Sequence, residues 1–346
     1  MELYTSKRLD TFRALQDPLA DQVIDKYFPA NKDLLQLHLS SLADNNDVLP
    51  EDAVAELKEL YDSIQETSSS FKSEDLAKGQ DFFDEYASDI MLLLGFLSLP
   101  YCYTAAYGAE VLVQSKRILE DPARRLMDTA SFVFDVTNKK AFESDGKALV
   151  SILKVRLLHA ATRWYINQSR NWDSDEKGKP INQEDMAGTN LSFSLIAIRG
   201  LRKLGKFIEP KKAFDYIDYW NKIGLLLGLH PDLIPETNKE AFYLEKQIRF
   251  RHFRTSEAGV QLTDSLYKYY EKAVKDSPLD GLTKPFMIHL LGDKVARQLG
   301  MEISNYDRMV FKPYQMFMNF RNYFFASQDS YAKAFARFKE TKEDTL

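Results

Sequence analysis

Long stretches of this sequence contain no residue that would interrupt a helix. The chain of 346 residues has only 14 Gly and 12 Pro, and the stretches between them are rich in Leu, Ala, Lys, Glu and Phe. Gly and Pro mark most turns, and a protein built from many short strands needs many turns. The sequence therefore predicts an all-α fold with almost no sheet.

The length and hydrophobic content predict a large buried core. With 45% hydrophobic residues, a chain of this size suits one large domain or two modest ones. We expect an amphipathic helical N-terminal region over residues 1–80, a helical core over 81–305 and a C-terminal helical extension over 306–346. The most hydrophobic helices fall in the core region, where we expect the functional site.

Charge and cysteine content narrow the range of partners. The formal net charge is −5, and acidic and basic residues are interspersed along the chain, so we expect no nucleic-acid partner. The single cysteine, Cys102, forms no intrachain disulfide and belongs to no C-x-x-C motif. Its apolar surroundings predict burial.

The sequence also argues against secretion and against a membrane role. Residues 1–8 contain no apolar region followed by a small-residue cleavage site, so we expect a cytoplasmic protein. The run from Ile90 to Ala109 is uncharged and approaches the roughly 20 residues that a membrane span needs. Pro100 interrupts it and several tyrosines follow. We therefore expect this run to be buried core.

One apolar helix is expected to carry a polar stripe. Residues 149–166 are apolar around most of a helical circumference, which predicts burial. Arg156, His159 and Arg163 interrupt them, and at about 100° per residue these three fall within roughly 60° of one another. Buried arginines need a counter-charge, and two of them beside a histidine favour its neutral form, which ligates metals.

Two interpretations of this stripe remain open. A haem would supply two propionates for the arginines and an iron for the imidazole. Alternatively, His159 is a core histidine bonded to a backbone carbonyl. The arginines would then pair with carboxylates such as those of Asp89, Glu110 or Asp135.

A second polar group precedes this helix. Arg125 and Thr129 are spaced i and i+4 and so share one helical face, with Asp128 beside them. An ordinary helix start explains the same residues, with Asp121 as the cap, Pro122 at the first position and Arg125 in solvent.

Together the two helices resemble the haem pocket of the latex-clearing protein family, which includes rubber oxygenases and MpaB-type oxygenases. The resemblance rests on two spacings about thirty residues apart and covers roughly residues 90–300. The residues that carry it are Arg125, Asp128 and Thr129, then Arg156, His159 and Arg163. Further matching stretches are 180–185, 200–205 and 220–228.

The resemblance implies a single large helical domain around a buried haem of b type. It implies His159 as the proximal iron ligand and places Arg163 near the haem. Arg125 and Thr129 match pocket residues on the distal side, and Glu110 is a candidate base by its rough position. Members of the family cleave carbon–carbon double bonds of isoprenoid chains with dioxygen.

Two positions depart from the family pattern. Asp128 stands where rubber-cleaving relatives can place a lysine as sixth iron ligand, and Trp164 stands where they can carry a second histidine. We expect both side chains to shape the cofactor pocket, with the iron open or bound to water. Rubber itself is then not the expected substrate.

The sequence thus predicts a haem b oxygenase that acts with dioxygen on an apolar small molecule, isoprenoid or otherwise unsaturated. A non-catalytic helical protein that binds haem or a lipid is the alternative, and a scaffold without a cofactor is a third. The sequence has no Glu-x-x-His pair for a di-iron site, no zinc motif and no Gly-rich phosphate loop.

Two further stretches mix aromatic residues with basic ones. The basic and aromatic run 249–254 is predicted to be a helix end with solvated or paired arginines, in preference to a nucleic-acid stacking site. The aromatic stretch 314–325 is predicted to be a packed C-terminal helix.

Overall fold

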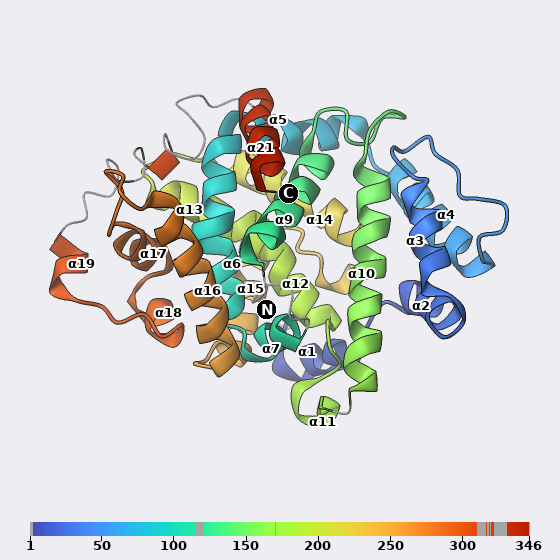
Figure 1. Cartoon of the computed structure of the whole chain (residues 1–346), viewed down its shortest axis with the longest axis horizontal. Coiled ribbons are helices and arrows are strands. Elements are labelled where there is room, and N and C mark those ends of the chain that lie inside the picture. The colour runs from blue at the N-terminus through green and yellow to red at the C-terminus, as the bar shows by residue number, and fades with distance from the viewer. Residues whose placement is uncertain are drawn as a thin grey trace. The chain divides into compact units, whose positions relative to one another are not determined.

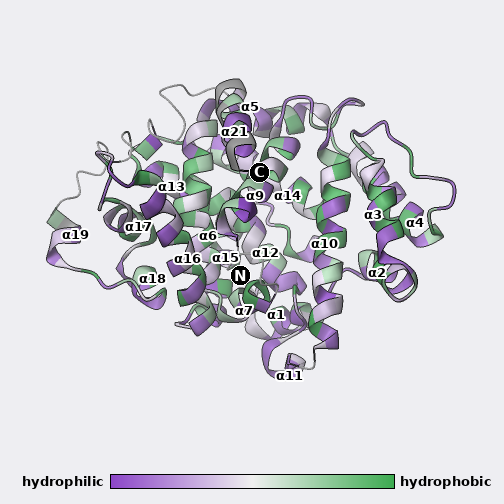
Figure 2. Ribbon diagram, viewed as in Figure 1, coloured by the Kyte–Doolittle hydropathy of each residue, from purple (hydrophilic) through white to green (hydrophobic). Residues whose placement is uncertain are grey.

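Every regular element that the structure describes is a helix (Figure 1). The structure is a computed structural model, and it describes residues 3–114, 121–169, 171–309, 316, 318, 320–321 and 331–345. Within these residues the only β pairing is one isolated bridge between Ala105 and Phe253. The prediction of an all-α fold is confirmed. Figure 2 shows that most helices carry both hydrophobic and hydrophilic residues, as an amphipathic pattern requires.

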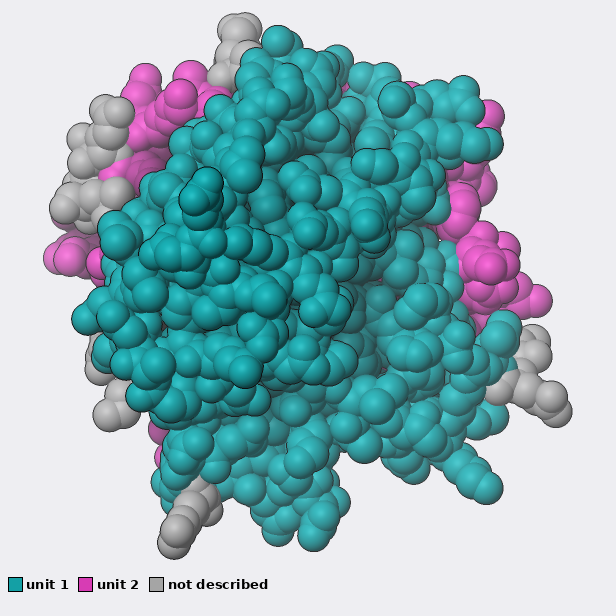
Figure 3. Space-filling view, turned by 90° about the vertical axis from the view of Figure 1, so that its right-hand side faces the viewer, with its two compact units in different colours: residues 1–81, 131–187, 218–235 teal, residues 82–130, 188–217, 236–346 magenta. Residues whose placement is uncertain are grey.

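The chain divides into two compact units, coloured separately in Figure 3. Unit 1 comprises residues 1–81, 131–187 and 218–235, and unit 2 comprises residues 82–130, 188–217 and 236–346. Four of the described helices contribute residues to both units: α5 (Ser73–Leu93), α9 (Pro122–Thr137), α12 (Gln183–Leu191) and α14 (Pro210–Leu226). The division into three consecutive segments stays a prediction.

Unit 1 is organised around α10 (Ala148–Gln168), a helix of 21 residues. It packs against α2 (Pro18–Ala30) and α4 (Ala55–Ser69), and α2 also packs against α3 (Lys32–Ser40). Asp17 caps α2, with Pro18 at the start of the helix, where a missing amide hydrogen costs nothing. The other elements of unit 1 are α1 (Ser6–Arg13), α11 (Ser174–Lys177) and η3 (Pro231–Leu233).

Unit 2 contains two π-helical turns, η1 (Leu94–Ser98) and η2 (Ser192–Ile196), which pack against each other. The Ser98 hydroxyl donates to the Ser192 carbonyl at 2.7 Å. Pro100 follows η1 and has no amide hydrogen for a regular α-helical bond, which favours a widened turn. The adjoining helices are α6 (Leu99–Tyr103), α7 (Ala106–Gln114) and α13 (Ala197–Lys203).

Stacked aromatic rings form part of the core of unit 2. Phe96 stacks on Tyr270 with ring centres 4.0 Å apart, and Phe286 stacks on Phe320 at 4.7 Å. Phe96 also meets Phe286 edge to face at 5.3 Å. The helices of this unit not yet named are α15 (Asn238–His252), α16 (Glu257–Val274), α17 (Thr283–Leu291), α18 (Asp293–Gln298), α19 (Asn305–Met309) and α21 (Tyr331–Thr345).

The apolar run over residues 90–109 is core, as predicted. It is divided among the end of α5, η1, α6 and the start of α7, and its leucines from Leu92 to Leu94 are buried. Across the described residues, the structure has no helix with the length and apolarity that crossing a membrane requires.

Short connections separate several helices. Gly292, whose φ is 81°, ends α17 before α18 begins. Residues 171–190 contain α11, and α12 starts at Gln183. In the aromatic stretch 314–325, Phe320 and Arg321 are buried as predicted. Residues 314, 315, 317, 319 and 322–325 lie outside the described residues.

Truncation of the aromatic stack is expected to destabilise the protein strongly. Phe286→Ala removes a fully buried ring, so the free energy of unfolding should fall by about 3–5 kcal/mol in urea titrations. Phe207→Ala is the control, because Phe207 is 84% exposed, and its effect should stay within about 0.5 kcal/mol. Equal effects of the two substitutions would contradict the packing described for this core.

Candidate functional site

The buried face of α10 holds two arginines, each paired with an aspartate from α2. Arg156 donates from Nε to Asp17 at 2.8 Å and from Nη2 at 2.7 Å. Arg163 donates from Nε to Asp21 at 2.6 Å. The side chains of Arg156, Asp17 and Arg163 are at most 7% exposed. Burial raises the pKa of the Asp21 carboxyl, and the Arg163 charge offsets only part of that rise.

These aspartates are not the acids that the sequence suggested. Asp135 instead accepts a hydrogen bond from Ser151 at 2.7 Å. In unit 2, Asp89 lies 3.2 Å from Lys206, and Glu110 accepts from Gln114 at 3.3 Å. Because α2 supplies both counter-charges, the arginines do not require an anionic ligand to be buried. Their contact with haem propionates stays a prediction.

A glycine permits the close packing around the first ion pair. Gly228 has a φ of 84°, which favours glycine, and a Cβ there would lie 2.9 Å from Asp17 Oδ2 and 3.0 Å from Arg156 Nη2. The Leu226 carbonyl, two residues earlier, also accepts from Arg156 at 3.3 Å. A larger residue at position 228 would push against both charged groups.

Two of the stretches that carry the family resemblance meet at this ion pair. Gln183, from stretch 180–185, donates to the carbonyl of Gly228, from stretch 220–228, at 2.9 Å. The same amide nitrogen donates to the Gln16 carbonyl at 2.8 Å, and the His230 amide donates to Gln183 Oε1 at 2.7 Å. Residues of both stretches therefore hold in place the backbone at Gln16, directly before Asp17.

His159 lies at the edge of the buried face of α10 that holds the two arginines. It is half-buried, whereas Arg156 is fully buried, and helix geometry turns it about 60° away from Arg156. Val155 and Thr162 lie beyond it and are also half-buried. The Thr162 hydroxyl donates to the Leu158 carbonyl at 2.8 Å, so it is engaged with its own helix. His159 thus lies between the buried arginines and a half-buried face of mixed polarity.

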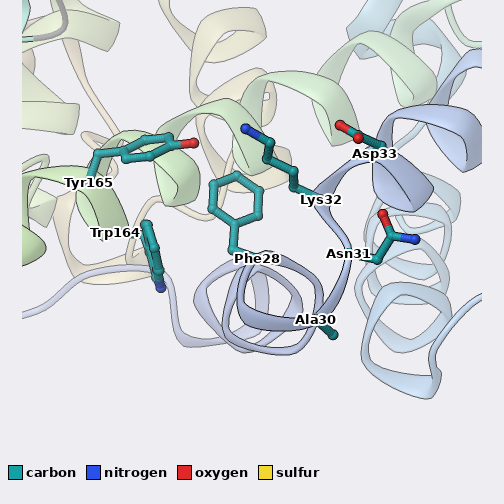
Figure 4. A pocket seen from close by; sticks show the side chains of 7 residues that line it. All are labelled: Phe28, Ala30, Asn31, Lys32, Asp33, Trp164 and Tyr165. Carbon is teal, nitrogen blue, oxygen red and sulfur yellow. The ribbon is translucent and has the colours of Figure 1, made fainter.

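Trp164 lies elsewhere on the same helix. It is about 140° around α10 from His159, and its ring meets Phe28 edge to face at 5.4 Å. Trp164 lines an open pocket of about 470 Å³, and Figure 4 shows its ring among the other side chains of that pocket. The lining residues are Phe28, Ala30, Asn31, Lys32, Asp33, Trp164 and Tyr165. The predicted contact of Trp164 with a cofactor stays a prediction.

The other candidate residues belong to unit 2, on α7 and α9. Asp121 caps α9 by accepting from the Arg124 amide at 2.9 Å, as the ordinary helix start predicted. Arg125 is half-buried instead of fully solvated, and the Thr129 hydroxyl donates to its carbonyl at 3.0 Å. Asp128 is exposed. The sequence-predicted set is therefore split, because Arg156, His159, Arg163 and Trp164 belong to unit 1.

Arg125 lies in the electrostatic environment of a buried tyrosine. Burial raises the pKa of the Tyr103 hydroxyl, and the positive charge of Arg125 works against that rise. Tyr103 is only 3% exposed. The positive charge of this half-buried arginine thus acts on a hydroxyl group inside unit 2. A fully solvated arginine would not do so.

Unit 2 also contains a buried charge cluster that sequence reasoning missed. Glu245 is 4% exposed and pairs with Arg199 at 2.6 Å and Arg249 at 2.8 Å. It also accepts a hydrogen bond from the Tyr101 hydroxyl. Burial alone would raise the pKa of Glu245, but the two arginines and Tyr101 outweigh it and lower that pKa. The spacing of Glu245 and Arg249, which are four residues apart, was the sequence signal that could have revealed this cluster.

Three comparisons with known proteins bear on this arrangement. The family described as ER-bound oxygenase mpaB/B'/Rubber oxygenase, catalytic domain, matches residues 85–321. The rubber oxygenase of Streptomyces sp. (strain K30) is 26% identical over 293 residues, which cover 82% of this chain and 69% of that protein. A structure of latex clearing protein LCP in the closed state shares the fold, with a TM-score of 0.76 and 21% identity over 96% of this chain and 91% of that one.

Loss of the Asp17 charge is expected to destabilise the protein. Asp17→Asn keeps a helix cap but leaves Arg156 buried without its counter-charge, so the free energy of unfolding should fall by about 3 kcal/mol. Urea titration measures it, and Asp25→Asn on the exposed side of α2 is the matched control. Adding Arg156→Met to Asp17→Asn should recover part of the loss. An Asp17→Asn effect no larger than that of Asp25→Asn would rule out the pairing.

Glu245 should make stability depend on pH in the acidic range. Its folded pKa lies below the ordinary value of 4.5, so its stabilising effect is complete above that value and is lost as pH falls through the folded pKa. Glu245→Gln should therefore be less stable than the wild type at pH 7, and this gap should close below about pH 4.5. The exposed Glu257→Gln is the control. A gap that stays constant with pH would refute this assignment.

Proposed function

Because this chain belongs to the family of MpaB and rubber oxygenases, we propose that it is a haem b-dependent oxygenase. Its substrates in this proposal are dioxygen and an apolar, unsaturated small molecule of isoprenoid type. The name of the Streptomyces relative, rubber oxygenase, supports the isoprenoid class.

The donor set of the described residues is compatible with a haem. These residues include no group of three or more His, Cys, Asp or Glu side chains able to hold a metal ion. An iron porphyrin brings four nitrogen ligands and needs only one or two from the protein. His159 offers one imidazole at the edge of a half-buried face of α10 that includes Val155 and Leu158. This position of His159 is the observation on which the proposal rests.

The neighbours of His159 keep it suited to ligation. Arg156 and Arg163 hold α10 against α2 through Asp17 and Asp21, so the backbone that carries the imidazole is anchored at two points.

The remaining roles follow the family resemblance. When bound, haem supplies the activation of dioxygen. We assign Arg125 and Thr129 to the distal side and Glu110, a half-buried carboxylate, to accepting an allylic proton of the substrate at a carboxylate oxygen. Asp128 replaces a lysine that can bind iron in relatives, so His159 is the only protein ligand in this proposal.

The absorption spectrum of the haem-loaded protein tests the ligand assignment. The wild type, purified and then titrated with haemin, should show a Soret band typical of histidine-ligated haem b. His159→Ala should lose or shift that band, because the iron loses its protein ligand. His230→Ala is the matched control, since His230 is also a half-buried histidine of unit 1 and lies outside α10. An unchanged band in His159→Ala would exclude His159 as the ligand.

Turnover then separates an oxygenase from a non-catalytic binder. Haem-loaded protein incubated with squalene under ¹⁸O₂ should yield labelled carbonyl products by mass spectrometry. Glu110→Gln should lower the rate by about a hundredfold while leaving the Soret band in place. A normal Soret band with no labelled product from squalene or shorter isoprenoid alkenes would favour the haem-binding alternative.

A further inference from the structure

The outward face of α15 in unit 2 alternates lysine with phenylalanine. Lys239, Phe242, Lys246 and Phe250 follow one another at intervals of three, four and four residues, so they lie within about 80° of the helix circumference. Both lysines are exposed, Phe242 is 44% exposed and Phe250 is 84% exposed. We call these four residues the α15 stripe.

The flanks of the α15 stripe carry no acidic residue. Arg249 lies on one side of it and Tyr243 on the other, and together with the stripe they span roughly 120° of the helix without a carboxylate. Glu240 lies farther round the helix, and Glu245 is buried in the ion pairs described above. A basic surface thus occurs on a chain whose net charge is −5, so the surface is complementary to an anionic partner.

The exposed phenylalanines are not required by the packing of α15. The other faces of the helix supply its buried side chains, which are Ala241, Leu244, Glu245, Ile248 and His252. A phenylalanine in water forgoes the free energy that burying its ring would gain. Phe250 therefore adds apolar surface that the described fold leaves in solvent.

We propose that the α15 stripe attaches this protein to the surface of an anionic membrane. Lysines near such a surface are attracted to anionic headgroups, and aromatic side chains settle at the headgroup level. Phe242 and Phe250 lie about 12 Å apart along the helix axis, with Lys246 between them. Separated rings with interleaved cations fit a headgroup layer better than they fit a protein interface, whose centre is contiguous and depleted of lysine.

This attachment differs from the membrane role that the sequence argued against. That argument concerned the apolar run 90–109 as a spanning segment, and the run is indeed buried core. The α15 stripe is a peripheral contact on another helix. The inference goes beyond the proposed function, and its test measures binding without turnover.

Vesicle cosedimentation of the full-length protein tests the proposal. The wild type should bind phosphatidylcholine vesicles that contain phosphatidylserine, bind pure phosphatidylcholine weakly, and dissociate as NaCl is raised. Lys239→Glu/Lys246→Glu should weaken binding more than tenfold, because each lost cation is worth about fivefold near an anionic surface. Phe242→Ser/Phe250→Ser should also weaken binding, through loss of the apolar contact.

Matched variants in unit 1 serve as controls. Lys7→Glu/Lys72→Glu changes two exposed lysines, and Leu37→Ser/Val48→Ser changes side chains that are 64% and 84% exposed. Both should bind vesicles as the wild type does. The proposal is overturned if the controls lose binding as the stripe variants do, if the wild type ignores anionic vesicles, or if it binds neutral vesicles equally well.

Two measurements keep the test decisive if a double variant folds poorly. Phe242 also contacts the Arg199 guanidinium at 5.4 Å, so Phe250→Ser alone is the second variant and should weaken binding by itself. Phe250→Trp should gain fluorescence quenching by brominated lipids in anionic vesicles beyond that of the three native tryptophans. No added quenching would refute the contact. Self-association that Phe250→Ser abolishes, without vesicle binding, would assign the stripe to a second copy of the chain.

Discussion

The buried ion pair between Arg156 and Asp17 is the interaction on which the arrangement of unit 1 depends. It joins residues 139 positions apart and fixes the start of α2 against the middle of α10. Neither group tolerates burial alone, because an uncompensated charge in a protein interior costs several kcal/mol. The surrounding residues serve the same contact: Gly228 leaves room for it, and Gln183 holds the neighbouring backbone.

This pairing changes the meaning of the arginine spacing on α10. On sequence grounds, two buried guanidinium groups beside a histidine needed counter-charges, either from the propionates of a haem or from carboxylates of the chain. In the structure α2 supplies both counter-charges, so the arginines act first as anchors of the helix that carries His159. The family resemblance, which the comparisons confirm, therefore includes residues whose described contacts are structural. A helix held at two points gives a ligand a defined position, and precise placement is what a metal site needs from its support.

Local features of the fold could be predicted and long-range pairings could not. The scarcity of Gly and Pro predicted the helices, α9 begins at the expected Pro122, and the bounds of α10 agree with the expected ones within two residues. Asp121 was identified as a cap because capping depends on neighbouring residues alone. Asp17 and Asp21 were missed because no local spacing connects them to residues on α10. Glu245 was missed because its burial depends on how α13 and α15 pack, which the sequence does not show.

The position of Asp17 and Asp21 near the start of the sequence limits how far the chain can be shortened. The segment recognised as the catalytic domain starts at residue 85, whereas Asp17 and Asp21 precede it by more than sixty positions. An expression fragment trimmed to the recognised segment would leave both guanidinium groups of α10 exposed or stranded. The N-terminal helices are thus part of the framework that holds α10. Any shortened form of this protein has to begin before α2.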